Sequence, residues 1–214
     1  MTYPRGPRLL KGAIIAVGAV GARASAIIFQ YNPESLRRSL QPQMLGGQGG
    51  GRVLTMRFTG APIETIDIEV TINAIDQLEH GEVASGIHPQ LLALEMLLYP
   101  ASQQVVQNTQ LLDQGTIEIG PYNAPLTLFI WGPNRVLPVT LLNCSITEEA
   151  FDVHLNPIQA TISLNMRAIS YSDIDSQNQA YNLFLAYQKH KESLALRGIL
   201  GDPTPVIGID PNQF

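Results

Sequence analysis

The sequence predicts a mainly β fold of the α+β class: an antiparallel β-barrel with one packed helix and a second helix near the C-terminus. Over long segments apolar and polar residues alternate with a period of two, which is typical of strands with one buried face. Two other segments have apolar residues at helical spacing, and turns rich in glycine and proline separate the elements. A sheet closed into a barrel, with a helix against it, is the economical way to bury these faces.

Seven segments are predicted as strands. The first two are joined by a glycine turn, and the third and fourth flank a Gly60-Ala61-Pro62 turn as a long hairpin. In the fourth segment Ile66, Ile68, Val70 and Ile72 alternate with polar residues, and residues 158–168 of the last segment show the clearest alternation in the chain. In chain order the predicted strands are residues 10–17, 26–31, 53–58, 66–73, 126–131, 136–147 and 152–169.

Two helices are predicted as well. Residues 88–99 have apolar side chains at helical spacing, with Pro89 at a favourable first position and Pro100 as a stop. The second helix begins at Ser176-Gln177-Asn178-Gln179, which has the form of a capping box, and it ends at Gly198. A barrel domain, residues 1–172, therefore precedes a C-terminal helix and an extended proline-rich tail, residues 173–214.

The composition indicates a protein that is covered by neighbours. Only 14% of the 214 residues are charged, against roughly 25% in an average soluble domain. A monomer needs charged surface to remain solvated, so the shortage suggests that much of the surface lies against other subunits. The net charge of −5 argues against a nucleic-acid partner, because phosphate contacts need a basic face.

The N-terminal segment has the outline of a secretory signal: basic residues, an uncharged run over residues 12–22, and Ala24-Ser25-Ala26. Glycines dilute that run and prolines open it, so a pair of strands is the favoured interpretation. No stretch reaches the roughly 18 apolar residues that a membrane span needs.

No pattern predicts an enzyme, a cofactor or a metal. The glycine tract of residues 46–51 leads into a strand and has no lysine, unlike a phosphate-binding loop. The four histidines show no metal-ligand spacing. Cys144 and His154 could form a nucleophile–base pair on adjacent strands, but a small buried thiol is the ordinary role of a cysteine in an apolar strand. A single cysteine also excludes an internal disulfide.

The segment Ile27-Ile28-Phe29-Gln30-Tyr31-Asn32-Pro33-Glu34-Ser35-Leu36-Arg37-Arg38-Ser39 resembles the signature of contractile injection system tube-type proteins, the inner-tube and tube-initiator components of phage-tail-like particles. Later segments agree in order. They are a strand over residues 68–76 that ends in Asp, the helix before Tyr99-Pro100, the segment Pro125-Leu126-Thr127-Leu128-Phe129-Ile130-Trp131-Gly132, and a closing strand from Pro157. The resemblance covers residues 10–172.

The resemblance implies a barrel of the phage tail-tube type and a hexameric ring between the inner tube and the baseplate spike, acting as tube initiator or spike adaptor. Its partners would be copies of itself, the inner tube protein, the spike and other baseplate components, without nucleic acid or direct membrane insertion. Assembly is expected in the bacterial cytoplasm, in a particle that is retained or released. Structural or inter-subunit roles are expected for Phe29, Tyr31, Asn32, Pro33, Arg37, Arg38, Trp131 and Gly132.

Two alternatives stay open. Within the same particle the chain could be a tube terminator or tube protomer. From the strand pattern alone it could be a small-molecule-binding β-barrel carrier. Residues 33–53, where tube-type proteins commonly have a long loop toward the adjoining ring, contain five glycines in six positions and are predicted to be mobile in an isolated subunit.

Overall fold

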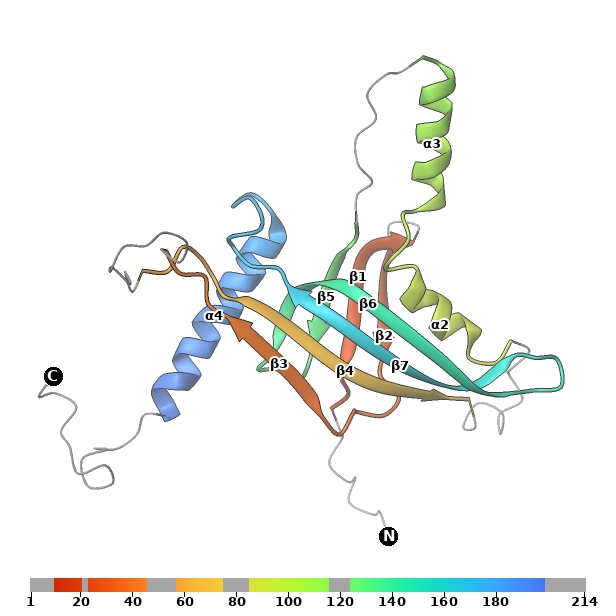
Figure 1. Ribbon diagram of the computed structural model, residues 1–214, viewed down its shortest axis with the longest axis horizontal. Helices are drawn as coiled ribbons and strands as arrows, with labels where there is room; N and C mark the ends of the chain where they lie inside the picture. Colours follow the sequence, from red (N-terminus) through yellow and green to blue (C-terminus); the bar gives the residue numbers. More distant parts are fainter. Residues whose placement is uncertain (1–9, 21–22, 46–56, 75–84, 116–123, 199–214) are drawn as a thin grey trace, which may run out of the picture.

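A computed structural model describes residues 10–20, 23–45, 57–74, 85–115 and 124–198. Within these residues seven strands form one antiparallel sheet in the order β2-β1-β5-β6-β7-β4-β3. Helix α2 lies beside β2, helix α4 lies across the other half of the sheet, and helix α3 projects from the body (Figure 1). The strands are β1 (Ala13–Val20), β2 (Arg23–Ile28), β3 (Leu36–Gln41), β4 (Ile63–Asn73), β5 (Leu126–Ile130), β6 (Val136–Phe151) and β7 (Pro157–Ala168).

One face of this sheet is apolar over most of its width, and the Arg38–Glu64 ion pair lies on it at the β3 edge. Ile14 of β1 is paired with Ile27 on one side and with Phe129 on the other, and Phe129 is paired with Leu137. Toward the other edge, Met166 of β7 is paired with Ile66 of β4 on one side and with Leu141 of β6 on the other. The predicted alternation is confirmed: the in-facing residues of β4 and β7 are buried or nearly so. Antiparallel sheets are commonly covered on one face only.

The predicted barrel is wrong, because the sheet in the described residues is open, with β2 at one edge and β3 at the other. Helix α2 (His88–Glu95) packs against β2 instead of another strand. The amide of Ile87 donates to the carbonyl of Pro157 at 2.9 Å, which fixes the start of α2 beside β7. Nearby, the side chain of Gln30 accepts a hydrogen bond from the amide of Asn73 at 2.8 Å. Helix α2 and the side chain of Gln30 thus link the β2 edge to the ends of β4 and β7 without strand pairing.

Helix α2 itself confirms the helix predicted near residue 88, although it ends at Glu95 and tighter turns continue to Leu98. Ile87, Leu91 and Leu94 are buried against the sheet. Proline in the first turn lacks only an amide that has no partner within the helix, so Pro89 favours this start.

Helix α4 (Gln179–Gly198) confirms the second predicted helix, but its predicted cap is wrong. The hydroxyl of Ser176 bonds to the carboxylate of Asp175, and the helix starts three residues later. The side-chain oxygen of Asn178 accepts a hydrogen bond from the amide of Ala180 at 3.0 Å. Asn178 is therefore the residue that caps α4.

The sequence analysis missed two elements, strand β3 and helix α3 (Ser102–Asp113). Strand β3 falls within the segment that was predicted to be a mobile loop. Three predictions lie wholly or mainly outside the described residues: the glycine tract, the strand at residues 53–58 and the extended tail.

Candidate inter-subunit interface

Aromatic residues of the two motifs meet around one glycine. Gly12 is buried, and a methyl group placed on its Cα would lie 2.8 Å from Phe29 Cδ2 and from two ring carbons of Trp131. The Trp131 ring also stacks on Phe129, with ring centroids 5.9 Å apart. Only a residue without a side chain fits between these rings. Gly12 therefore allows the backbone just before β1 to pack against Phe29, which follows β2, and Trp131, which follows β5.

The side chain of Asn32 adds to this junction two hydrogen bonds to backbone groups, of the kind that a neighbouring strand would make. Its side-chain oxygen accepts from the amide of Gly12 at 2.9 Å, and its side-chain nitrogen donates to the carbonyl of Leu10 at 2.7 Å. The amide of Phe29 donates to the carbonyl of Gly12 at 2.9 Å. The predicted motif residues Phe29, Asn32 and Trp131 thus all lie at Gly12.

Two other residues of the first motif, Tyr31 and Pro33, line the surface. Tyr31 is more than half exposed and lines, with Pro33, an open cleft of about 510 Å³ that Glu69 and Thr71 close on the β4 side. Gly132 has φ +71° in the turn after β5, a backbone conformation that glycine adopts without strain. The structure keeps Tyr31 and Pro33 apart from the rings at Gly12.

Arg38, predicted as a motif residue, is engaged inside the subunit. Its guanidinium lies 2.6–2.7 Å from Oε1 of Glu64, a carboxylate that is only 2% exposed. Lys191 of α4 lies 3.8 Å from the other oxygen of that carboxylate. The ammonium also lies 4.9 Å from the ring centre of Tyr187. These charges join edge strand β3 to the terminal helix.

Helix α4 is fixed at further points. Phe184 and Tyr187 belong to the same buried cluster as the sheet, and His190 forms a hydrogen bond of 3.0 Å with Asn134 in the β5–β6 turn. Burial, followed by the charge of Glu64, raises the pKa of the Tyr187 hydroxyl. Tyr187 therefore stays neutral across the physiological range, as its buried position requires.

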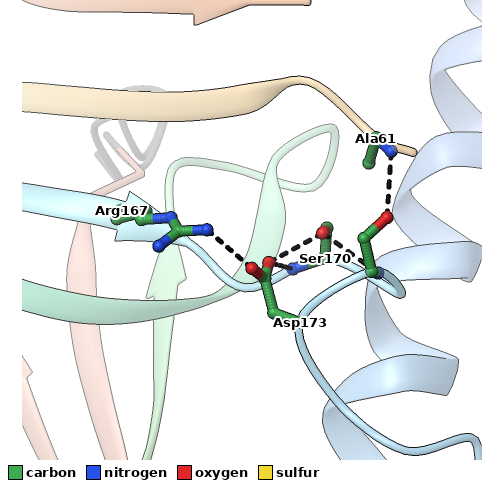
Figure 2. A network of polar contacts seen from close by, with 5 residues as sticks. Ala61, Arg167, Ser170 and Asp173 are labelled. Carbon is green, nitrogen blue, oxygen red and sulfur yellow. Dashed lines mark hydrogen bonds and ion pairs between the residues drawn. The ribbon is translucent and has the colours of Figure 1, made fainter. Parts of the chain in front are cut away.

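A polar network fastens the turn between β7 and α4 (Figure 2). The carboxylate of Asp173 accepts hydrogen bonds from the amide and hydroxyl of Ser170 and forms an ion pair of 2.6 Å with Arg167. Ser172 in turn accepts a hydrogen bond from the amide of Ala61 at 3.0 Å. The network therefore holds the residues that lead into β4 against the end of β7.

The outer face of the sheet changes character from one edge to the other. In the β4–β7 half it is polar: the amide of Asn165 donates to the carboxylate of Asp67, in a shallow cleft that Arg37 and Asn143 also line. In the β1–β5 half, by contrast, the outward-facing residues on either side of the buried Ile14 and Phe129 are all apolar. They are Ala13 and Ile15 in β1 and Leu128 and Ile130 in β5. An apolar outer face of this kind is typical of a strand that is covered on both sides.

The two long hairpins expose apolar side chains at their ends. We define the hairpin tip as residues 148–157, the turn between β6 and β7, and the β3–β4 arm as residues 36–45 and 57–63. In the tip Val153 is 93% and Leu155 78% exposed, and Phe151 about half. In the arm Phe58 is 71% exposed, and Leu40, Met44 and Leu45 about half. Large exposed apolar side chains that gather in this way mark interaction surfaces.

Helix α3 has no buried residue, and Asp113 is its one charged side chain. Its exposed apolar residues include Val105, Val106, Leu111 and Leu112. An isolated helix of this length is marginal in water, so contacts with another surface would stabilise it.

The described residues do not bring together a set of metal ligands. They contain no group of three or more His, Cys, Asp or Glu side chains that could hold a metal ion. Burial, with a smaller effect of Glu95, raises the pKa of the Cys144 thiol, which is the opposite of what a nucleophile needs. Among the helices in the described part of the chain, none has the length and apolar character to cross a membrane.

The comparisons with known proteins give little. No family model and no curated protein matches the sequence. A chain of a solved structure described as the "Tail of empty GTA particle computed with helical refinement, C6 symmetry" is 14% identical, and the match covers 73% of this chain and 90% of that chain with a TM-score of 0.28. A TM-score of this size carries no argument about fold or function.

The sequence analysis did not find the residues at the hairpin tip or the buried carboxylate of Glu64. For Glu64 a signal existed, since it occupies the in-facing position two residues before Ile66 in an alternating strand. For Val153 and Leu155 the alternation breaks at the turn, and only the structure shows that both side chains face solvent.

Proposed function

We propose that the chain is a structural subunit of a phage-tail-like contractile injection system, in which it forms a hexameric ring, connects the inner tube to the baseplate spike and initiates tube assembly. The sequence resemblance over residues 10–172 supports the class of particle. One structural observation carries the assembly: an open sheet exposes apolar side chains at both of its hairpin ends and has an apolar outer half. Neighbouring subunits would remove this surface from water.

In this role the chain acts mechanically. The backbone groups on the free sides of edge strands β2 and β3 can pair with neighbouring chains, and a closed ring leaves no copy with a free edge. The ring would present one surface to the tube, whose polymerisation it seeds, and another to the spike. No step of this function needs a catalytic residue.

Image classification of purified particles tests the proposal directly. We expect this chain in six copies on the particle axis, between tube and spike. A ring at the far end of the tube would identify a terminator, and rings along the tube a protomer. A single copy away from the axis, or a chain that never enters a particle, would overturn the proposal.

The carrier alternative is less well supported. The face of the sheet that would line a ligand cavity is filled by Phe129, Ile162 and other buried residues, with Leu91 of α2 and Phe184 of α4 against them. A carrier should nevertheless bind an apolar fluorescent probe as a monomer. Saturable binding of one probe per monomer would favour that function.

A further inference from the structure

The two apolar hairpin ends lie at opposite ends of the molecule. In the β4–β7 pair Thr65 is opposite Arg167, and Asn73 is opposite Gln159. The β3–β4 arm therefore continues past one end of the strands, and the hairpin tip past the other. Figure 1 shows the β6–β7 turn and the β3–β4 extension at the two ends of the long axis. One subunit cannot bring these two surfaces together.

The charges at the two ends are of opposite sign. The hairpin tip contains Glu148, Glu149 and Asp152 and no lysine or arginine. The β3–β4 arm contains three arginines and no acidic residue. Glu64 takes up the charge of Arg38, whereas Arg37 and Arg57 are exposed, and Arg57 directly precedes the exposed Phe58. Charge of opposite sign around two apolar patches favours their mutual contact.

The hairpin tip is a rigid, strained turn and not a loose loop. Asp152 Oδ1 accepts hydrogen bonds from the amides of His154 and Asn156 at 2.7 and 2.8 Å. Leu155 has φ +63°, a conformation that glycine and asparagine adopt easily and that a branched side chain rarely does. A leucine that is strained and also faces solvent has no role in the stability of the subunit, so the outlier points to a function.

The arm that would receive this tip is also ordered. The amide of Leu45 donates to the carbonyl of Arg57, and the amide of Thr59 donates to the carbonyl of Gln43, both at 2.9 Å. These bonds extend the β3–β4 hairpin and place Met44 opposite Phe58. The network at Ala61 fixes the base of the arm to the body.

We propose that the hairpin tip of one copy docks on the β3–β4 arm of the next copy, with Val153 and Leu155 against Phe58 and the tip carboxylates beside Arg57. This contact deepens the proposed function and rests on it for the closure of the chain of copies into a ring. The two surfaces of the contact differ, so it is head to tail, and contacts of this kind close into rings when the rotation permits.

Disulfide trapping between two full-length chains tests the contact. In a Cys144→Ala background, one chain carries Val153→Cys and a differently tagged chain carries Phe58→Cys. Oxidation of the mixture should give a covalent heterodimer. Its yield should be well above the yield of disulfide-linked homodimer that each chain forms by itself. The control mixture pairs Phe58→Cys with Leu196→Cys, because Leu196 is an exposed leucine of α4 outside both surfaces. A heterodimer yield no higher than in this control would overturn the proposal.

Two further tests, each with its own variants, separate the contact from folding. Leu155→Asn relieves the strained backbone, so thermal unfolding should be unchanged or occur at higher temperature while trapping is lost; Leu196→Asn should leave trapping unchanged. Glu148→Lys should weaken trapping, and adding Arg57→Glu to the partner chain should restore it. Trapping that persists in Leu155→Asn, or that the charge exchange does not restore, would overturn the proposed contact.

The outcomes for the contact and for the proposed function are distinct. If this chain forms sixfold rings in particles and its Leu155→Asn variant still assembles into them, the proposed function is supported and the proposed contact is wrong. Efficient trapping in a chain that never enters a tail-like particle would leave the contact standing and remove the function.

Discussion

Replacing Arg38 by methionine tests whether the Arg38–Glu64 pair stabilises the subunit or whether Arg38 is reserved for a neighbour. The carboxylate of Glu64 is 2% exposed, and Arg38 contacts it at 2.6 and 2.7 Å. Removing one partner of a buried pair typically costs about 3–5 kcal/mol. Lys191 remains 3.8 Å from the carboxylate, and the Arg38 side chain is 24% exposed, so we expect the lower loss of about 2–3 kcal/mol.

The double variant Arg38→Met with Glu64→Met sharpens the test. Removing both charges eliminates the unpaired buried carboxylate, so most of the lost stability should return, to within about 1 kcal/mol of the unchanged protein. Arg37→Met is the matched control, because Arg37 is the neighbouring arginine of β3 and is exposed. Its effect should stay within about 0.5 kcal/mol.

Urea unfolding, followed by far-UV circular dichroism and Trp131 fluorescence at one fixed protein concentration, measures these differences. With a slope of about 1–3 kcal/mol per molar urea, the Arg38→Met midpoint should fall by roughly 0.7–3 M at unchanged slope. An Arg38→Met midpoint equal to that of Arg37→Met would refute the role of Arg38 inside the subunit. So would a double variant that is no more stable than the single one.

Three further predictions have defined outcomes. Gly12→Ala forces a methyl group into the rings beside it and should destabilise the fold by about 1–3 kcal/mol in urea unfolding, with a changed emission spectrum of Trp131; an unaltered midpoint would contradict the tight junction. Asn178→Ala should cost about 1 kcal/mol as the loss of a helix cap, whereas Ser176→Ala should cost little, and the reverse order would restore Ser176 as the cap. Hydrogen bonds from Asn156, above all from its side chain, lower the pKa of Asp152 in the folded protein. The charged carboxylate therefore stabilises the tip fully at pH values above the unfolded pKa of Asp152, about 3.9. This stabilisation is lost as the pH falls through the lower pKa of the folded state. Titration by NMR should give a pKa of Asp152 below that of the unfolded chain and should show the tip loosening only in that acidic range. An unshifted pKa of Asp152 would contradict the hydrogen bonds of the turn.

Much of the sheet could be predicted because its signal is local. Strands β4 and β7 have a two-residue alternation over their whole length, and the faces predicted from it are the faces observed. Burial on one face of an antiparallel sheet imposes this period on the sequence, whatever the strands pair with. Helices α2 and α4 could be predicted for the same kind of reason, from apolar spacing and end signals.

Strand β3 and helix α3 could not be found in this way, because neither buries a regular face. On the in-facing side of β3, Arg38 lies between Leu36 and Leu40, and it reads as a solvated residue until β4 supplies the carboxylate of Glu64 beside it. Helix α3 buries no residue within the described part of the chain, and its apolar side chains, Val105, Val106, Leu111 and Leu112 among them, face solvent. Only partners that are distant in the sequence explain either element.

The sequence by itself determined that this is a mainly β chain with two packed helices and a shortage of charge. The tertiary structure alone decided that the sheet stays open, with α2 and the Gln30–Asn73 hydrogen bond, and no strand pairing in the described residues, linking the β2 edge to the ends of β4 and β7. It alone also gathered Gly12, Phe29 and Trp131 at one point. Periodicity reports which face of an element is buried, but not what covers that face, since the covering residues come from other parts of the chain.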